Sequence, residues 1–339
     1  MRLIKTEDAV GHVLCHDMTQ IIKDQYKDAR FRKGHIVTEE DIPVLLSMGK
    51  EHLYVWEMTS GTVHENDAAE RLLALCGQEN MIRSGVKEGK IELKAACDGV
   101  FLVDSARLVA VNSQDEVMIA TRKGGMAVRE GDKLAGMRVI PLIIEEEKLR
   151  KAEQAAGDKP LLSLKPYVRK TACIVATGGE VKKGLIKDTF TPVVIDKLKT
   201  YGIETLEVVY SGDGVENVRD AVLAMRERKP DMILCTGGMS VDPDDNTPGG
   251  IKAAGANIIA YGAPVLPGAM FLLGYFDDGM PVMGLPGCVM YAGATVFDLV
   301  LPKIAADVPV TRADLAALGE GGLCLGCKPC HYPICPFGK

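Results

Sequence analysis

Short apolar runs and helix-spaced apolar residues alternate along the second half of the chain. The runs, such as TACIVAT and DMILC, predict buried strands at 171–177, 204–209, 231–236 and 281–285. The stretches between and after them predict helices at 191–201, 215–227, 249–255 and 289–301. Strands separated by helices of this length are typical of an α/β fold with a parallel sheet and helices on both faces.

The first half has a different pattern. Residues 1–60 predict a small α+β module with a helix after Thr38. Residues 61–150 predict a helix within 61–82 and then a β-rich module, with strands at IELKAA, VFLVD, LVAV, VMIATR and MRVIPLII. The expected organisation is therefore these two modules, an α/β domain at 168–310 and a cysteine-rich tail at 320–339.

Composition and charge narrow the range of partners. The chain has 339 residues, of which 47% are hydrophobic, and a net charge of −6. A negative net charge gives no reason to expect nucleic acid as a partner. The longest apolar stretch, residues 260–275, is broken by glycine and proline, and the charged N-terminus does not resemble a signal peptide. We expect a cytoplasmic protein without a membrane partner.

Glycines and acids gather where the predicted strands end. Parallel sheets bind ligands outside the carboxyl ends of their strands, which places four turns along one edge: 177–180, 211–213, 236–245 and 285–288. Glycines let backbone N–H groups approach an anion, and carboxylates beside an anion require a divalent cation or proton chemistry. The turns therefore predict a phosphorylated ligand and Mg²⁺. The alternative is that glycines only end strands and the acids are solvated.

Four segments resemble a known family. They are residues 176–203, the turn TGGMSVDPDD, the stretch PVLPGAMFLLGYFDDGMPVMGLPG and the helix after it. In this order they are similar to the molybdopterin-binding domain shared by molybdopterin adenylyltransferases, molybdopterin molybdotransferases and gephyrin. The resemblance implies binding of molybdopterin or adenylyl-molybdopterin with Mg²⁺, molybdate as a further partner, and a homodimer. The smaller modules before this domain also resemble the molybdotransferase arrangement.

The resemblance assigns roles residue by residue. Catalytic acids would be Asp245, Asp213 and Glu180, with Asp245 and Asp242 at the metal. The pterin phosphate or nucleotide would contact the turns and a helix start, through Thr177, Gly178, Gly179, Asp188, Thr236, Gly237, Gly238, Ser240, Pro286, Gly287 and Cys288. Asp242 and Asp244 are either helper acids or solvated loop residues. Lys182, Lys183 and Lys187 lie near the first turn and are either ligand contacts or exposed charges.

Two positions depart from the family pattern. Asp188 is followed by Thr189-Phe190, where the family has a polar third residue, so Asp188 either contacts a ligand or only caps a helix. Cys288 replaces an amide after the Leu-Pro-Gly turn. It either packs beneath a helix start, or a helix N-terminus lowers its pKa and makes it a soft ligand for molybdenum.

The tail brings together four thiols. Cys324, Cys327, Cys330 and Cys335 follow a C-x₂-C-x₂-C-x₄-C spacing that includes His331 and three prolines. Such spacing suits structural Zn²⁺ or an iron–sulfur cluster. A flexible tail, or a segment that handles metal through its thiols, remains the alternative.

Three functions stay open at this point. The first is an enzyme of molybdenum cofactor biosynthesis, similar to a molybdopterin molybdotransferase, that takes part in molybdate insertion. The second is a non-catalytic carrier or chaperone of the cofactor for a molybdoenzyme client. The third is a Mg²⁺-dependent nucleotide pyrophosphatase, because a related family carries a similar domain and Asp244-Asp245 fits its acidic turn.

Overall fold

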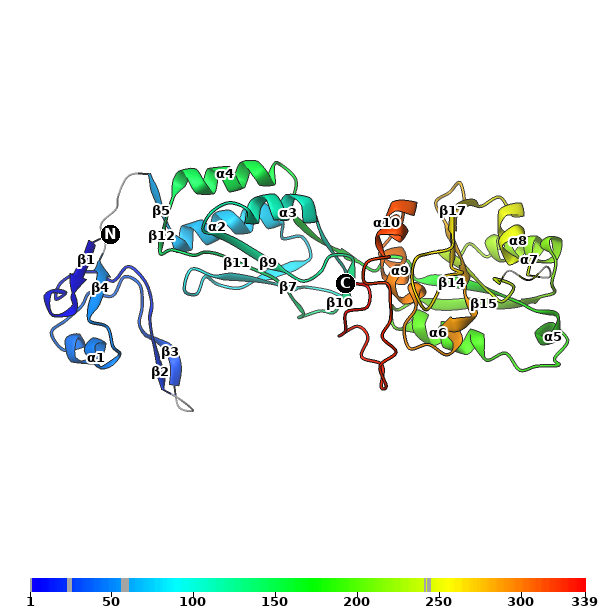
Figure 1. The fold of residues 1–339 in the computed structure, drawn as a ribbon, viewed down its shortest axis with the longest axis horizontal. Helices are drawn as coiled ribbons and strands as arrows, with labels where there is room; N and C mark the ends of the chain where they lie inside the picture. Colours follow the sequence, from blue (N-terminus) through cyan, green and yellow to red (C-terminus); the bar gives the residue numbers. More distant parts are fainter. Residues whose placement is uncertain (1, 23–25, 56–60, 241, 243–244) are drawn as a thin grey trace. The chain divides into compact units, whose positions relative to one another are not determined.

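The computed structural model describes residues 2–22, 26–55, 61–240, 242 and 245–339, in two units (Figure 1). The first unit comprises Met1–Ala96, Val103–Gly124 and Gly131–Ser163. The second comprises Cys97–Leu102, Gly125–Glu130 and Leu164–Lys339. The α/β domain and the tail therefore share one unit, which also takes in two short segments from the β-rich part of the chain.

The N-terminal part of the first unit is a small α+β structure. Strand β1 (Arg2–Lys5) pairs antiparallel with β4 (His52–Val55), and β2 (Met18–Ile22) pairs antiparallel with β3 (Tyr26–Phe31). Helix α1 (Asp41–Ser47) follows Thr38 and buries Leu45 among the apolar residues of these strands.

The remainder of the first unit is built on a four-stranded sheet. Its order is β6 (Met81–Arg83), β7 (Ile91–Ala95), β11 (Lys133–Val139) and β9 (Val117–Thr121), and β5 (Thr62–His64) pairs separately with β12 (Ile143–Glu145). Three helices accompany these strands, namely α2 (Glu65–Cys76), α3 (Ser105–Asn112) and α4 (Glu146–Ala156).

One strand prediction in this module is wrong. The segment LVAV lies inside helix α3, because the side chain of Asp104 accepts a hydrogen bond from the backbone N–H of Arg107 at 3.1 Å and caps the helix start. A cap four residues before an apolar run favours helix over strand, whatever the strand propensity of the two valines in that run.

The second unit contains a six-stranded sheet. Its order is β15 (Glu204–Ser211), β14 (Thr171–Thr177), β16 (Met232–Thr236), β19 (Pro281–Leu285), β18 (Leu272–Tyr275) and β17 (Asn257–Tyr261). The first four strands are parallel, which confirms the predicted α/β fold. Strands β18 and β17 extend the sheet antiparallel and were not predicted. A smaller sheet of β10 (Met126–Val128), β8 (Gly99–Val103) and β13 (Leu162–Pro166) accompanies it.

Helices cover both faces of the large sheet. Helices α6 (Phe190–Lys199) and α9 (Val296–Ala305) bury Val194, Leu198 and Phe297 against one face. Helices α7 (Val215–Glu227) and α8 (Thr247–Ala253) bury Val222 and Ile251 against the other. None of the helices in the described ranges combines the length and apolar composition that a membrane-spanning segment needs.

The last long helix starts later than predicted. After β19 the chain forms a 3₁₀ turn, η2 (Gly287–Met290), and α9 begins only after Thr295. Thr295 and Asp298 form a reciprocal capping box, in which the Thr295 hydroxyl and the Asp298 carboxylate each accept a backbone N–H. The apolar residues before Thr295 continue the helical pattern but not the helix.

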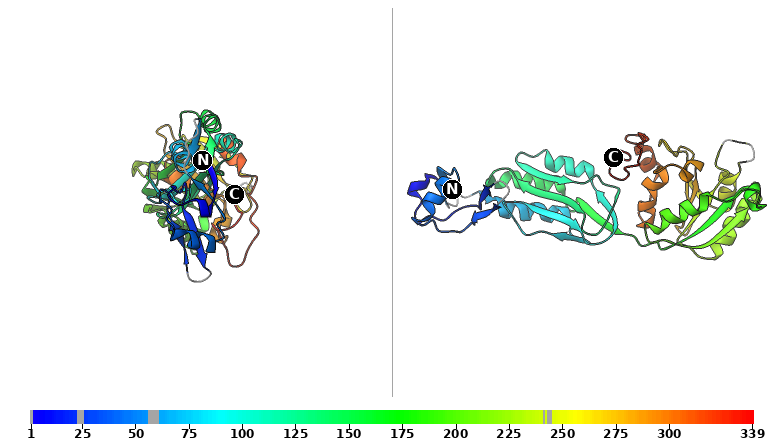
Figure 2. Two further views of the ribbon diagram at one scale, coloured as in Figure 1. Left: turned by 90° about the vertical axis from the view of Figure 1, so that its left-hand side faces the viewer. Right: turned by 90° about the horizontal axis from the view of Figure 1, so that it is seen from below.

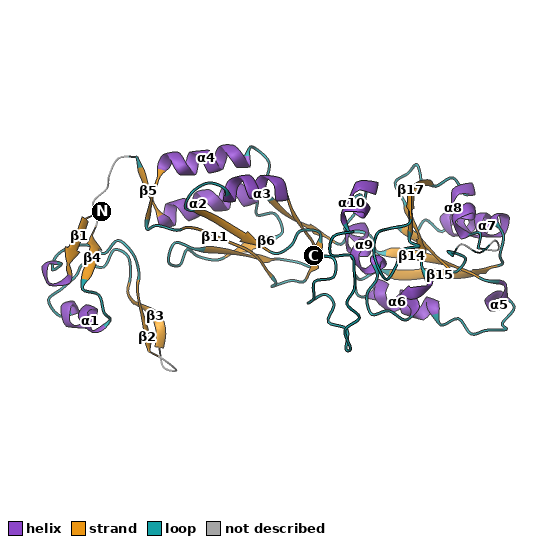
Figure 3. Cartoon of the chain, in the orientation of Figure 1, coloured by secondary structure: helices purple, strands orange, loops and turns teal. Residues whose placement is uncertain are grey.

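The tail has little regular structure, yet both its ends are fixed. Helix α10 (Arg312–Ala317) precedes it, and Figure 3 draws the residues beyond as loop. At its start Cys324 donates its backbone N–H to the carbonyl of Leu266 at 2.8 Å. At its end Phe337 is 2% exposed. The tail and α9 lie side by side in Figures 1 and 2.

Candidate functional site

Strand register brings the four predicted turns to one edge. Thr177 at the end of β14 pairs with Ser211 at the end of β15, and Ala176 pairs with Thr236 at the end of β16. Thr236 pairs with Leu285 at the end of β19. The loops that follow these strands therefore leave the carboxyl edge as neighbours, in the order β15, β14, β16, β19.

The Gly-Gly turn after β16 is held tightly against the turn after β14. Both Gly237 (φ +81°) and Gly238 (φ +58°) adopt the left-handed conformation. A Cβ on Gly237 would overlap the carbonyl oxygen of Thr177, and one on Gly238 would lie 2.5 Å from the Thr247 hydroxyl oxygen. Only glycine fits both positions without displacing the neighbouring loop.

Buried hydroxyl groups join the same loops. Thr177 is 8% exposed and donates its hydroxyl to the carbonyl oxygen of Thr236 at 2.9 Å. Thr247, at the start of α8, donates to the carbonyl of Gly237 at 2.9 Å, and its hydroxyl lies 3.2 Å from that of Thr177. The turn backbone is therefore fixed before any ligand binds.

Two acids accept hydrogen bonds from backbone N–H groups of the turns. Asp213, after β15, accepts the N–H of Gly179 through Oδ2 at 2.9 Å. Asp245 accepts the N–H of Ser240 through Oδ2 at 2.9 Å. Each carboxylate thus accepts a backbone N–H group of a neighbouring turn residue. These contacts show that both N–H groups are directed toward negative charge, and they also give each acid a role in stabilising its turn.

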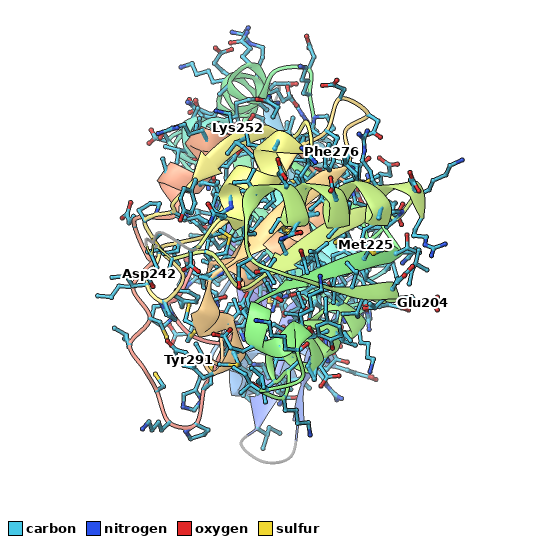
Figure 4. The ribbon with its side chains drawn as sticks, turned by 90° about the vertical axis from the view of Figure 1, so that its right-hand side faces the viewer. Glu204, Met225, Asp242, Lys252, Phe276 and Tyr291 are labelled. Carbon is cyan, nitrogen blue, oxygen red and sulfur yellow. The ribbon has the colours of Figure 1, made fainter. Side chains whose placement is uncertain are left out.

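The remaining predicted acids are more open. Glu180 is exposed in the one-turn helix α5 (Gly179–Lys182), and Asp242 is exposed in the loop after β16. Figure 4 labels Asp242 and also Tyr291, which lies just beyond η2. Asp244 lies outside the described residues. Lys182 places its ammonium nitrogen 3.9 Å from where a Cβ of Gly212 would stand, so one cation reaches the turn after β15.

Asp188 caps helix α6. Its Oδ1 accepts the backbone N–H groups of Phe190 at 2.9 Å and Thr191 at 3.0 Å, and the Tyr210 hydroxyl donates to Oδ2 at 3.2 Å. Burial by itself would raise the pKa of Asp188, but the hydrogen bonds from Thr191, Phe190 and Tyr210 outweigh it and lower the pKa. The carboxylate is therefore already satisfied by its own helix and a neighbouring strand.

The turn after β19 does not activate its cysteine. Pro286 is buried, Gly287 is exposed and Cys288 is half-buried in η2, where its carbonyl accepts the N–H of Ala292 at 2.9 Å. Burial raises the pKa of the Cys288 thiol. The interpretation that a helix N-terminus lowers this pKa is therefore wrong, because the long helix begins at Val296 and the thiol is desolvated instead.

Three residues near the edge were missed in the sequence. Tyr261 donates its hydroxyl to the carbonyl of Met239 at 3.0 Å, and its pKa is raised by burial and by the charge of Asp245. Tyr210 contacts Asp188, and Thr247 joins two turns. A signal existed only for Thr247, which precedes a proline at a helix start. The tyrosines reach the edge from strands through pairing that no local pattern reveals.

The tail cysteines are not arranged as a preformed metal centre. Across the described ranges, no three side chains of His, Cys, Asp or Glu are placed to hold one metal ion. Cys324 and Cys335 are half-buried, and Cys327 and Cys330 are exposed. The edge acids Asp245, Asp213 and Asp242 likewise form no such group with other described residues.

Fold and edge together define an α/β protein whose sheet carries glycine-rich turns and acids at the carboxyl edge of its parallel strands. Residues 173–306 match the family model described as the probable molybdopterin binding domain. This part of the chain is a domain of that family, as its motifs predict. Residues 3–57 match a second family model, described as a domain of unknown function (DUF8806).

Curated relatives match a short part of the chain. A CinA-like protein of Mycobacterium tuberculosis is 33% identical over 76 residues, which are 22% of this chain and 18% of the relative. A CinA-like protein of Petrotoga mobilis is 32% identical over 76 residues, 22% of this chain and 19% of the relative. The chain thus spans about a fifth of the length of these relatives.

Solved structures with a similar domain have low identity. The CinA protein of Thermoplasma acidophilum is 17% identical, with 40% of this chain and 98% of that chain covered and a TM-score of 0.35. The molybdopterin biosynthesis Mog protein of Mycobacterium ulcerans is 20% identical, with 41% and 99% covered and a TM-score of 0.35. The assignment of residues 173–306 rests on the family model and on the motifs, not on these scores.

Proposed function

We propose that the carboxyl edge of the large sheet binds molybdopterin or adenylyl-molybdopterin, with Mg²⁺, and takes part in molybdate insertion during molybdenum cofactor biosynthesis. One observation carries the proposal. The turns after β14 and β16 each direct a backbone N–H toward a carboxylate oxygen, at Gly179 and Ser240. A phosphate oxygen has the charge and hydrogen-bonding preference of those carboxylates, so the same N–H groups suit a phosphorylated ligand.

Magnesium would change which group occupies the turns. A phosphate alone must displace Asp213 and Asp245 and would then face two like charges. Mg²⁺ prefers carboxylate and phosphate oxygens and keeps several waters. An ion held by Asp245, with Asp242 nearby and Asp213 or Glu180 on the adjacent loops, would draw the carboxylates off the N–H groups and neutralise the repulsion. The expected consequence is that ligand binding requires Mg²⁺.

Chemistry at such a site would be electrostatic. Adenylyl transfer to molybdopterin and loss of the adenylyl group during molybdate insertion both develop charge on a phosphoryl oxygen. Turn N–H groups, the metal and Lys182 would stabilise that charge. Asp188 would position the start of α6 rather than react, because its oxygens are engaged by Phe190, Thr191 and Tyr210.

The test is a titration of the full chain with molybdopterin and with adenylyl-molybdopterin, with and without Mg²⁺. Asp245→Asn removes the charge but keeps an oxygen that can accept the Ser240 N–H. We expect it to weaken Mg²⁺-dependent binding by about tenfold, which corresponds to about 1.4 kcal/mol. Asp277→Asn is the matched control, because Asp277 is exposed in the turn before β19, at the opposite edge of the sheet.

Assays of the same wild-type chain distinguish the competing functions. Release of the adenylyl group on addition of molybdate would identify an enzyme, and binding without turnover would identify a carrier for a molybdoenzyme. The third candidate, Mg²⁺-dependent hydrolysis of a nucleotide diphosphate such as ADP-ribose, is assayed on the same chain in the absence of pterin. Absence of pterin binding by the wild-type chain would overturn both cofactor hypotheses. The proposed homodimer is tested by sedimentation equilibrium.

A further inference from the structure

The tail is an integral part of the second unit. Pro302 lies inside α9 and has no N–H to offer the carbonyl of Asp298 four residues earlier. Tyr332 in the tail donates its hydroxyl to that carbonyl at 3.0 Å. Burial raises the pKa of Tyr332, which keeps the hydroxyl protonated as a donor. Its ring meets that of Phe337 edge-on, with centroids 6.1 Å apart.

Between its fixed ends the tail forms an open loop. Cys324 and Cys335 pack against the main core of the domain. Within the described structure, residues 325–330 take part in no backbone–backbone hydrogen bond. The loop can therefore change its path at low cost while its two ends stay in place. This organisation differs from a free tail, in which all four thiols would have to be ordered on binding.

All four thiols line the same cavity. It has a volume of about 340 Å³. The residues that line it include the four cysteines, one histidine, Lys328 and, from the loop after η2, one tyrosine: Cys324, Cys327, Cys330, Cys335, His331 and Tyr291. Cys330 also packs closely on the backbone of that loop, since its Sγ lies 2.7 Å from where a Cβ of Gly293 would stand.

We propose that this cavity is a binding site for one thiophilic divalent cation of the Zn²⁺ class. Thiolate and imidazole ligands select such ions, and structural Zn²⁺ sites use four ligands drawn from cysteine and histidine. Cys324 and Cys335 supply thiols at the fixed ends, and Cys327 and Cys330 supply thiols on the loop. This proposal does not depend on the pterin site, because none of these residues belongs to the four edge turns.

Binding requires the loop to close. The described residues hold no three ligands already at one point, so Cys327 and Cys330 must move inward toward the anchored pair. The lack of backbone–backbone hydrogen bonds between residues 325–330 and the rest of the described structure permits this movement. Fixed ends reduce the ordering cost of binding, as preorganisation does for any ligand.

The experiment uses the full chain, reduced and freed of metal, titrated with Co²⁺ as a spectroscopic substitute and then with Zn²⁺ in competition. We expect one Co²⁺ per chain, thiolate-to-cobalt absorption with tetrahedral character, and displacement by Zn²⁺. The double variant Cys327→Ser/Cys330→Ser should lose the signal. Both side chains are exposed, so its circular dichroism and its unfolding without metal should match those of the wild type.

A cysteine outside the tail provides the control. Cys97→Ser removes a half-buried thiol that does not line the cavity, and it should bind Co²⁺ as the wild type does. Stoichiometric Co²⁺ binding by the double variant would overturn the proposal, and so would a wild-type chain that binds neither ion. Iron and acid-labile sulfide in anaerobically purified protein would also overturn it, in favour of an iron–sulfur cluster.

Discussion

Gly237 lies where the turn after β16 packs against Thr177 at the end of β14. Its positive φ and the nearby Thr177 carbonyl leave no room for a side chain. The same glycine lies in the turn that the family resemblance assigns to the pterin phosphate. A structural need therefore explains this glycine without a ligand, and the residues whose contacts bear on function are the acids that occupy the turn N–H groups.

Substitution of Gly237 tests whether the fold requires glycine at this position. Gly237→Ala should lower the free energy of unfolding by about 2–4 kcal/mol, because a left-handed alanine costs about 1–2 kcal/mol and the overlap with Thr177 adds to it. Gly255→Ala is the control, since Gly255 also has a positive φ (+91°) but no atom within 4 Å of the new Cβ. Urea unfolding measures both. Equal losses in the two variants would show that the close contact costs nothing.

Asp188 offers a test by pH. Its pKa is lowered in the folded protein, so the charged form stabilises the fold above the unfolded pKa of about 3.9, and this contribution disappears as the pH falls through the lower folded value. Asp188→Ala should therefore lose about 1 kcal/mol at pH 7, and less as the pH falls below about 4. Urea unfolding from pH 7 to pH 3 measures the difference.

Asp188→Asn is the companion variant, because its amide oxygen can still accept the N–H groups of α6. It should lose less stability than Asp188→Ala. If Asp188→Ala instead unfolds as the wild type does but no longer binds pterin, Asp188 is a ligand contact and the capping role is secondary.

At the scale of elements, the local pattern of apolar residues was sufficient to predict the parallel strands and α7. Helix α7 has the predicted bounds, 215–227. It failed where a single residue decides the element. Asp104 caps the helix that contains LVAV, and Thr295 caps α9 at a later residue than the pattern predicted. It failed too for β17 and β18, because an antiparallel extension of the sheet depends on pairing and not on periodicity.

The pairing of Tyr332 with α9 is an element-scale prediction. Tyr332→Phe leaves the Asp298 carbonyl without this donor and should lower the free energy of unfolding by about 1–3 kcal/mol. Tyr291→Phe is the control, because Tyr291 is 78% exposed. Urea unfolding, followed by circular dichroism, compares the two. A loss no larger than that of the control would mean that the carbonyl finds another partner.

At the scale of the whole molecule, the sequence predicted which turns meet but not what surrounds them. Because strands of one parallel sheet share an edge, the turns after residues 177, 211, 236 and 285 could be placed together from the sequence. The occupation of the turn N–H groups by Asp213 and Asp245 could not, since it depends on loop conformation. The position of the tail depends on contacts between residues far apart in the chain.

Removal of the tail should therefore destabilise the second unit and not merely remove thiols. A chain ending at Glu320 loses the buried Phe337, worth about 1.5–3 kcal/mol, and the Tyr332 hydrogen bond. We expect the transition of this unit to lose about 3–5 kcal/mol in urea, while Cys327→Ser/Cys330→Ser in the full chain loses nothing in the absence of metal. An unchanged unfolding transition after truncation would show that the contacts of the tail with α9 do not stabilise this unit. Loss of metal by the truncated chain could arise from unfolding as well as from missing ligands, whereas the double variant removes only the thiols.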